Sequence, residues 1–225
     1  MEQTGFKVYG YRWVMLLAYM FAVAINQLLW ITFAPITSDA TKFYNVSDLS
    51  IGLLSLIFMI VYIFVSIAAS WAIDTWGIRV AIGIGAAMTG IFGLLRGVFA
   101  SDYNMVLVTQ IGIAIGQPFI LNAVTTVAAR WFPIQERATA AGLGSLAIYL
   151  GILVGLALTP YLLLQSSIDD LALNLQLVLQ SLSEHSHHLG PLILDHTLPT
   201  FFPLLQLLLE LDSLLLQLSL KLCPL

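Results

Sequence analysis

Charge is what this chain has least of. Charged residues make up 9% of its 225 residues, hydrophobic residues make up 60%, and the mean hydropathy is +0.96. A soluble domain carries about 25% charged residues, and disorder requires low hydrophobicity, so the composition excludes both. A single cysteine excludes a secreted disulfide scaffold, and eight scattered Lys and Arg residues exclude a nucleic-acid-binding surface. We therefore expect the partner of this chain to be a lipid bilayer, and we expect no nucleic acid.

Long runs without charge recur along the first part of the chain. They cover residues 13–38, 49–73, 103–129 and 138–168, and a fifth run, 80–95, continues without charge beyond Arg96 to residue 100. A helix of about 20 residues crosses the hydrocarbon core of a bilayer, and lipid offers an open backbone no hydrogen-bond partner. The sequence thus predicts an all-α polytopic membrane helix bundle with five spanning helices.

The loops between these runs predict the orientation of the bundle, because cytoplasmic loops carry more Lys and Arg. With the N-terminus inside, five such residues lie on the cytoplasmic side and two on the outer side. We expect an integral protein of the plasma membrane with a cytoplasmic N-terminus. Arg96, at the end of its run, is expected to snorkel outward to water.

The composition changes sharply near residue 170. Leucine makes up 23 of the 55 residues from 171 to 225, and every Trp, Tyr and Met lies earlier. The letters "LALNLQLVLQ" alternate as in a strand, whereas polar residues of the last 25 positions recur at helical spacing and form one stripe. We interpret 1–168 as a transmembrane bundle and 169–225 as a leucine-rich segment of doubtful origin, and we hypothesise a shifted reading frame.

The chemistry of enzymes and metal sites is missing. No Ser/His/Asp or Cys/His set occurs before residue 168, so we expect no enzyme. The four histidines all lie after residue 170, at positions 185, 187, 188 and 196, without the spacing of a structural zinc site. We expect no metal and no cofactor.

Three segments carry motifs. "SWAIDTWGIRV", between the second and third runs, contains Asp74, Gly77 and Arg79, and a short turn of this kind needs glycine. "ARWFPIQERATAAG", between the fourth and fifth runs, contains Arg130, Glu136 and Arg137. "GILVGLALTP", in the fifth run, places Gly151 and Gly155 on one helix face for close helix contact and ends at Pro160.

In this order and spacing the three segments resemble the major facilitator superfamily, with Ser70 where the loop motif usually has glycine. More narrowly, "LLWITFAPITSDATKFYNVS" and "GQPFILNAVTTVAARWFPIQERATA" resemble the first and fourth helices of the feline leukaemia virus subgroup C receptor-related transporters, a family associated with choline, ethanolamine and haem. The resemblance covers roughly residues 11–165. It implies the N-terminal six-helix half of a major facilitator fold, whose partner is a C-terminal half or a second copy.

The resemblance also implies residue roles. Trp30 would contact a cationic amine and Gln117 would hydrogen-bond the solute, while Asp74, Gly77 and Arg79, with Arg130, Glu136 and Arg137, would gate the cytoplasmic side. The residues alone leave other readings open. Trp13 and Trp30 are 17 residues apart, about 25 Å of helix, which also suits two interfacial anchors. Gln117, which precedes a helix-breaking proline, is either a solute ligand or a helix–helix contact, and the same ambiguity holds for Asn26, Gln27, Gln110 and Asn122.

The function expected from these observations is movement of a small organic solute, such as choline or ethanolamine, by alternating access. Two alternatives remain. The chain could be a truncated, non-transporting membrane protein or a half-transporter that pairs with a second copy. It could also be a haem- or metal-handling membrane protein that uses the histidines of the last segment.

Overall fold

The computed structural model describes residues 10–165, and all of their regular elements are helices. In chain order these are α1 (Arg12–Ile31), the short 3-10 helix η1 (Ala34–Ile36), α2 (Thr37–Tyr44), α3 (Asp48–Thr75), α4 (Ile78–Val98), α5 (Tyr103–Leu121), α6 (Val124–Trp131) and α7 (Ile134–Gln165). Five segments are long and apolar enough to cross a membrane. The predicted all-α bundle with five spans is therefore confirmed. The leucine-rich segment 169–225, with its four histidines and the hypothesis of a shifted frame, lies outside the described residues.

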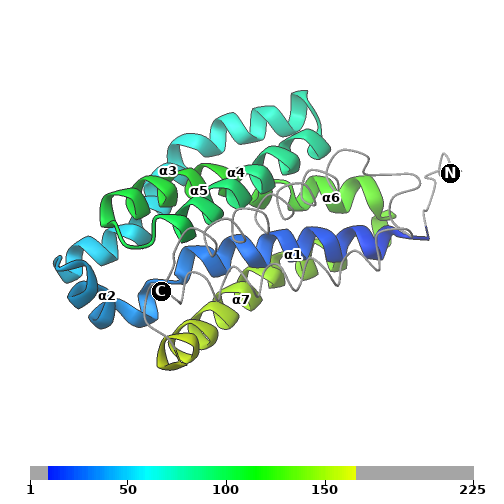
Figure 1. The fold of residues 1–225 in the computed structure, drawn as a ribbon. Helices are drawn as coiled ribbons and strands as arrows, with labels where there is room; N and C mark the ends of the chain where they lie inside the picture. Colours follow the sequence, from blue (N-terminus) through cyan, green and yellow to red (C-terminus); the bar gives the residue numbers. More distant parts are fainter. Residues whose placement is uncertain (1–9, 166–225) are drawn as a thin grey trace, which may run out of the picture.

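The spans pack side by side, α1 parallel to α7 and α3 parallel to α5, while α4 runs antiparallel to α5. α1 lies along α7, and α5 lies between α4 and α3 (Figure 1). The short helix α2 lies at one end of the bundle, and the N-terminus of the chain lies at the opposite end (Figure 1). The bundle thus has two distinct ends, here called the α2 end and the N-terminal end.

Two of the predicted continuous spans are divided. The first run breaks after α1, where η1 contains Pro35, and the fourth run breaks at Asn122 and Ala123, between α5 and α6. A proline has no N–H for the helix ladder, and Pro118 stands inside the last turn of α5. Charged residues mark where a run leaves the membrane, but they do not mark a break in the helix within that run.

Glycines set how closely the helices approach. On α7, a Cβ atom at Gly151 would lie 2.8 Å from Cα of Ala24 on α1, and one at Gly155 would press on the side chain of Ile31. On α4 and α5 the contact is reciprocal, since a Cβ at Gly85 would lie 2.8 Å from the Gly116 carbonyl oxygen. Backbones therefore touch at both interfaces, as expected when small residues line the contact of membrane helices.

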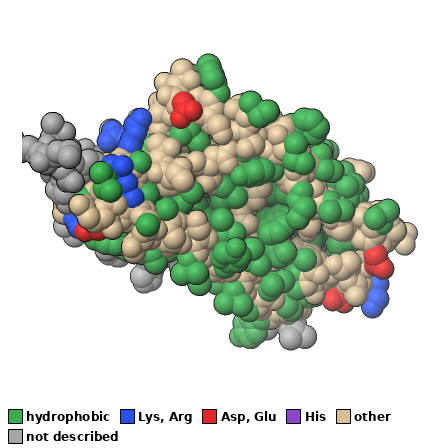
Figure 2. Space-filling view, turned by 180° about the vertical axis from the view of Figure 1, so that it is seen from behind, with side chains coloured by type: hydrophobic (Ala, Val, Ile, Leu, Met, Phe, Trp, Pro, Cys, Tyr) green, Lys and Arg blue, Asp and Glu red, His purple; other side chains and the backbone are tan. Residues whose placement is uncertain are grey.

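The surface is apolar between the two ends. Figure 2 shows hydrophobic side chains covering the middle of one face, with Lys, Arg, Asp and Glu toward its ends. Large exposed residues on α3 and α7 include Ile63, Phe64, Ile67, Tyr149 and Leu153. Such faces suit lipid or another apolar bundle and not water, so the protein is an integral membrane protein.

Candidate functional site

The contacts between α1 and α5 show which of the predicted site residues lie at the same depth. The hydroxyl of Tyr19 donates to the Ile120 carbonyl (3.1 Å), whereas Asn26 bonds Thr89, whose hydroxyl lies against Gly116. Residue numbers therefore rise along α1 as they fall along α5. Gln117 is about level with Asn26, and Trp30 is one turn of helix, about 6 Å, closer to the α2 end.

Gln117 is buried, and its side chain lacks a hydrogen-bond partner in the described part of the chain. Its side chain is 6% exposed, and no hydrogen bond joins its amide to another of the residues 10–165. Most buried polar side chains have a partner, so an amide without one is available to a ligand. The next residue is Pro118, which cannot donate to the carbonyl of Ala114. One side-chain amide and one main-chain acceptor thus lie close together on α5.

Trp30 is held in place by α3. Its indole Nε1 donates to the Ser55 carbonyl at 3.0 Å, and the residue is half-buried against the apolar core. An interfacial anchor would direct this N–H to lipid headgroups, whereas here the group is satisfied by another helix. The bond fixes the plane of the ring, and the aromatic face of Trp is the best of any side chain for a cation.

Asn26 and Gln27 are buried in contacts between helices. The amide of Asn26 donates to the Thr89 hydroxyl on α4 (3.0 Å), and the amide of Gln27 donates to Asn26 Oδ1 (3.4 Å). Both residues are at most 2% exposed. Asn26 thus joins α1 to α4, and Gln27 bonds Asn26 within α1.

Asn122 binds α3 at the break between α5 and α6. Its Oδ1 accepts from the Tyr62 hydroxyl at 2.6 Å, and its Nδ2 donates to the hydroxyl oxygens of Ser66 (2.9 Å) and Ser70 (3.1 Å). Sequence reasoning singled out Asn122 but missed its three partners. Their spacing of four residues places them on one face of α3, and that spacing was the available signal. Ser70, where the loop motif usually has glycine, supplies one of these bonds.

The loop motifs meet at the N-terminal end. Gly77 has a φ of +86°, which favours glycine, and a Cβ there would lie 3.7 Å from Nη1 of Arg130. Asp74 and Arg79 are exposed, and neither has a hydrogen bond or ion pair with another described residue.

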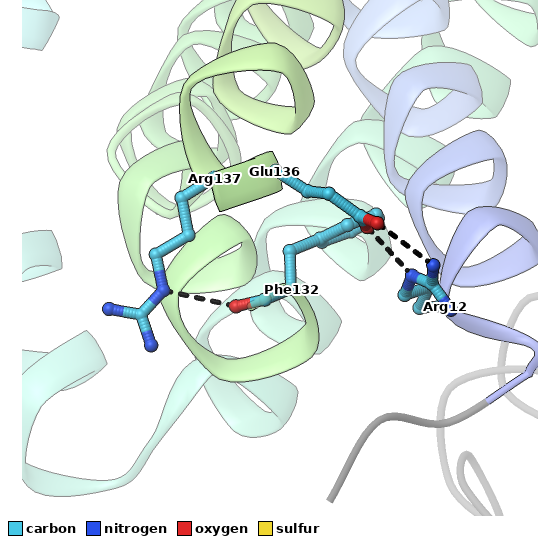
Figure 3. Close-up of polar contacts among 4 residues, drawn as sticks. All are labelled: Arg12, Phe132, Glu136 and Arg137. Carbon is cyan, nitrogen blue, oxygen red and sulfur yellow. Dashed lines mark hydrogen bonds and ion pairs between the residues drawn. The ribbon is translucent and has the colours of Figure 1, made fainter. Parts of the chain in front are cut away.

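Glu136 and Arg137 have partners within the bundle. Glu136 forms a two-point ion pair with Arg12 at 2.9 and 3.1 Å, which joins the starts of α1 and α7 (Figure 3). Nε of Arg137 donates to the Phe132 carbonyl at 3.0 Å (Figure 3). Arg12 is the partner that sequence reasoning did not identify.

The expected outward snorkelling of Arg96 is wrong. Its side chain is 7% exposed, and its Nη1 donates to the Leu29 carbonyl (2.8 Å) and to Gln110 Oε1 (2.9 Å). The carbonyls of the last helical turn have no partner within their own helix. Leu29 belongs to the last turn of α1, and this acceptor, together with Gln110, draws the guanidinium inward.

The chemistry of this region is therefore aromatic and amide-based. Within residues 10–165, no three His, Cys, Asp or Glu side chains come together to hold a metal ion. The acidic residues of α1 to α7 lie near helix ends or in α2, as Asp39, Asp48, Asp74 and Glu136 do. A cation bound between α1 and α5 would thus meet an indole face and amide oxygens, and no carboxylate from the interior of these helices.

Comparison with known proteins agrees with this architecture. A model described as Major Facilitator Superfamily matches residues 10–169. A bacterial homologue of the human lysosomal transporter Spinster, solved in an inward-facing, unoccupied conformation, superposes with a TM-score of 0.64, covering 96% of this chain and 44% of that one, at 21% identity. That structure supports the fold.

Relatives in animals match the same N-terminal part. An uncharacterised MFS-type transporter of Caenorhabditis elegans is 31% identical over 77% of this chain and 30% of its own length. Solute carrier family 49 member A3 of Danio rerio is 33% identical (69% and 34%), and the choline/ethanolamine transporter FLVCR1 of Mus musculus is 32% identical (67% and 27%). The chain spans about a third of the length of these relatives, and the resemblance seen in the sequence is confirmed.

Proposed function

This chain belongs to the major facilitator superfamily, and from that premise we propose that it forms one wall of a pathway that moves a small organic solute across a membrane by alternating access. The fold of five packed spans with a polar region between α1 and α5 supports the proposal. In transporters of this kind, solutes bind near the midplane between two bundles, at broken helices and polar side chains.

The substrate class that fits this wall is a compact cationic amine such as choline or ethanolamine. The observation that carries the proposal is Gln117, a buried amide without a partner among the described residues, one helical turn in depth from the indole of Trp30. Trp30 would bind the ammonium by its ring face, and Gln117 would accept or donate a hydrogen bond to the hydroxyl. The name of the mouse relative, a choline/ethanolamine transporter, supports the same class.

The opposite wall would come from a second bundle, either a further six helices of a longer chain or a second copy. Transport by rocking requires two bundles, and the chain spans about a third of its relatives. Asp74, Gly77 and Arg79 would gate the cytoplasmic side, with Arg130, Glu136 and Arg137 in the adjoining loop. The exposure of Asp74 and Arg79 suits partners on the second bundle. The N-terminus would be cytoplasmic and the membrane the plasma membrane.

The residues of this wall do not require solute transport to be coupled to proton movement. Within residues 10–165, no carboxylate lies in the interior of a spanning helix to carry a proton, and we propose facilitated diffusion down the solute gradient. A membrane potential negative inside would then favour the uptake of a cation.

Binding to the purified chain tests the proposed site without requiring transport. The chain in lipid nanodiscs is incubated with radiolabelled choline, and unlabelled ethanolamine is the competitor. We expect saturable binding that Trp30→Ala reduces at least tenfold, because loss of a desolvated cation–π contact of about 2 kcal/mol has that effect. Trp13→Ala, on the same helix at the N-terminal end, is the control and should bind as the parent chain does.

Saturable binding that survives Trp30→Ala, or its absence from the parent chain, would overturn the amine site. Uptake by cells that express the chain then tests the second wall. Uptake that depends on two copies, shown by mixing active and Trp30→Ala chains, supports a half-transporter, whereas binding without uptake supports a longer parent protein.

A further inference from the structure

The cluster of Arg96 and Gln110, between α1, α4 and α5, has more hydrogen-bond donors than acceptors. Nη1 of Arg96 donates to the Leu29 carbonyl and to Gln110 Oε1. No hydrogen bond from its Nε or Nη2 is found to any described residue. Gln110 accepts from Arg96 through its side-chain oxygen. Its side-chain nitrogen, Nε2, is buried and donates to no described residue.

No group in this part of the chain neutralises the arginine. The residue is 7% exposed, and no carboxylate of the described residues pairs with it. The ring of Phe33, 5.5 Å from Cζ, and the carbonyl end of α1 offset the charge in part. A buried charge and a buried donor without partners both cost free energy, so the cluster lacks one acceptor that carries negative charge.

We propose that Arg96 and Gln110 bind a small monatomic anion, of which chloride is the abundant example, at the α2 end of the bundle. The α5 side of the site is deeply buried, because Gln110 and its neighbours Ile113 and Ala114 are all 0% exposed. Among side chains this deeply buried, a monatomic ion needs the least room and accepts from several donors at once, whereas a lipid phosphate or an organic carboxylate needs more. The site is separate from the proposed amine site, and it does not rest on the proposed function.

The anion would also influence the last turn of α1. Leu29, whose carbonyl Arg96 holds, is followed directly by Trp30. Neutralising Arg96 removes a positive charge from the surroundings of that indole, where a cationic solute would otherwise be repelled. The same anion stabilises the contact between α4 and the end of α1.

Thermal unfolding of the full 225-residue chain in nanodiscs, followed by tryptophan fluorescence, tests this site. The unfolding midpoint is measured in sodium chloride, sodium bromide and sodium gluconate at equal ionic strength. We expect the two halides to raise the midpoint by about 3 °C in a saturable way, because a ligand that binds only the folded state stabilises it. Gluconate, a much larger organic anion, should give no such rise.

The variants Arg96→Gln and Gln110→Leu should abolish the halide effect, and Lys42→Gln, which removes an exposed positive charge at the same end, should keep it. Should Arg96→Gln fail to fold, Gln110→Leu carries the test, with chloride-35 NMR line broadening as a second readout of binding. A halide effect that persists in Gln110→Leu, or a midpoint that is equal in all three salts, would overturn the proposal and leave a water molecule as the acceptor.

Discussion

Arg12 and Glu136 join the first and last described helices by two parallel hydrogen bonds, from Nε to Oε2 at 2.9 Å and from Nη2 to Oε1 at 3.1 Å. The two side chains are 124 positions apart in the sequence and 19% and 36% exposed. The same guanidinium lies 6.0 Å from the ring of Phe132. This one ion pair thus joins the start of α1 to the start of α7 at the N-terminal end of the bundle.

The ion pair should contribute a small, salt-sensitive share of stability. We expect a double-mutant cycle of Arg12→Ala and Glu136→Ala to give a coupling free energy of about 0.5–1 kcal/mol at low salt, because partly exposed pairs are screened. The measurement is the free energy of unfolding by SDS titration in mixed micelles. A coupling that does not change between low salt and high salt would contradict the assignment of this contact as electrostatic.

Adding a methyl group at Gly151 should separate α7 from α1. A Cβ there meets the backbone of Ala24, which cannot move without shifting α1, so Gly151→Ala should lower the free energy of unfolding by about 1–3 kcal/mol. Gly142→Ala is the matched control on the same helix, because nothing lies within 4 Å of its Cβ position. That control should be neutral or stabilising by up to about 1 kcal/mol. Equal effects of the two substitutions would show that α1 and α7 do not pack as described.

The hydroxyl of Tyr62 should stabilise the contact between α3 and Asn122. Tyr62→Phe removes a 2.6 Å hydrogen bond to the Asn122 side chain and should cost about 1 kcal/mol, the usual scale for such bonds between membrane helices. Tyr149→Phe, on the exposed surface of α7, is the control with the same chemical change. We expect no measurable change for it in the same SDS titration, and a loss as large as that of Tyr62→Phe would argue against a specific role for the network.

Gln117 and Gln27 should respond differently to the same substitution. Gln117→Leu removes no internal hydrogen bond of the described chain, so the unfolding free energy should stay the same or rise, while the affinity for choline falls about tenfold. Gln27→Leu removes a buried bond to Asn26 and should lower stability. Both quantities can be measured on the same nanodisc samples. Loss of stability without loss of choline binding in Gln117→Leu would assign this residue to helix packing instead.

Some features of the loop motif could be predicted from the sequence, and others could not. Gly77 was predicted from the need for a tight turn, and its positive φ supplies the reason. The role of Ser70 at the motif's usual glycine position was not predictable, because its partner Asn122 is 52 positions away on another helix. The direction of Arg96 failed for the same reason, since both of its acceptors belong to other helices.

The number of spans and their approximate limits were determined by the sequence alone. The thickness of a bilayer and the cost of placing charge inside it act on each segment separately, so a count of charge-free residues suffices. The tertiary structure decided which polar residues bond to a neighbouring helix and which have no side-chain hydrogen bond to another described residue. Asn26, Gln117 and Asn122 look alike in the sequence, and they differ in the atoms that other helices bring within hydrogen-bonding distance.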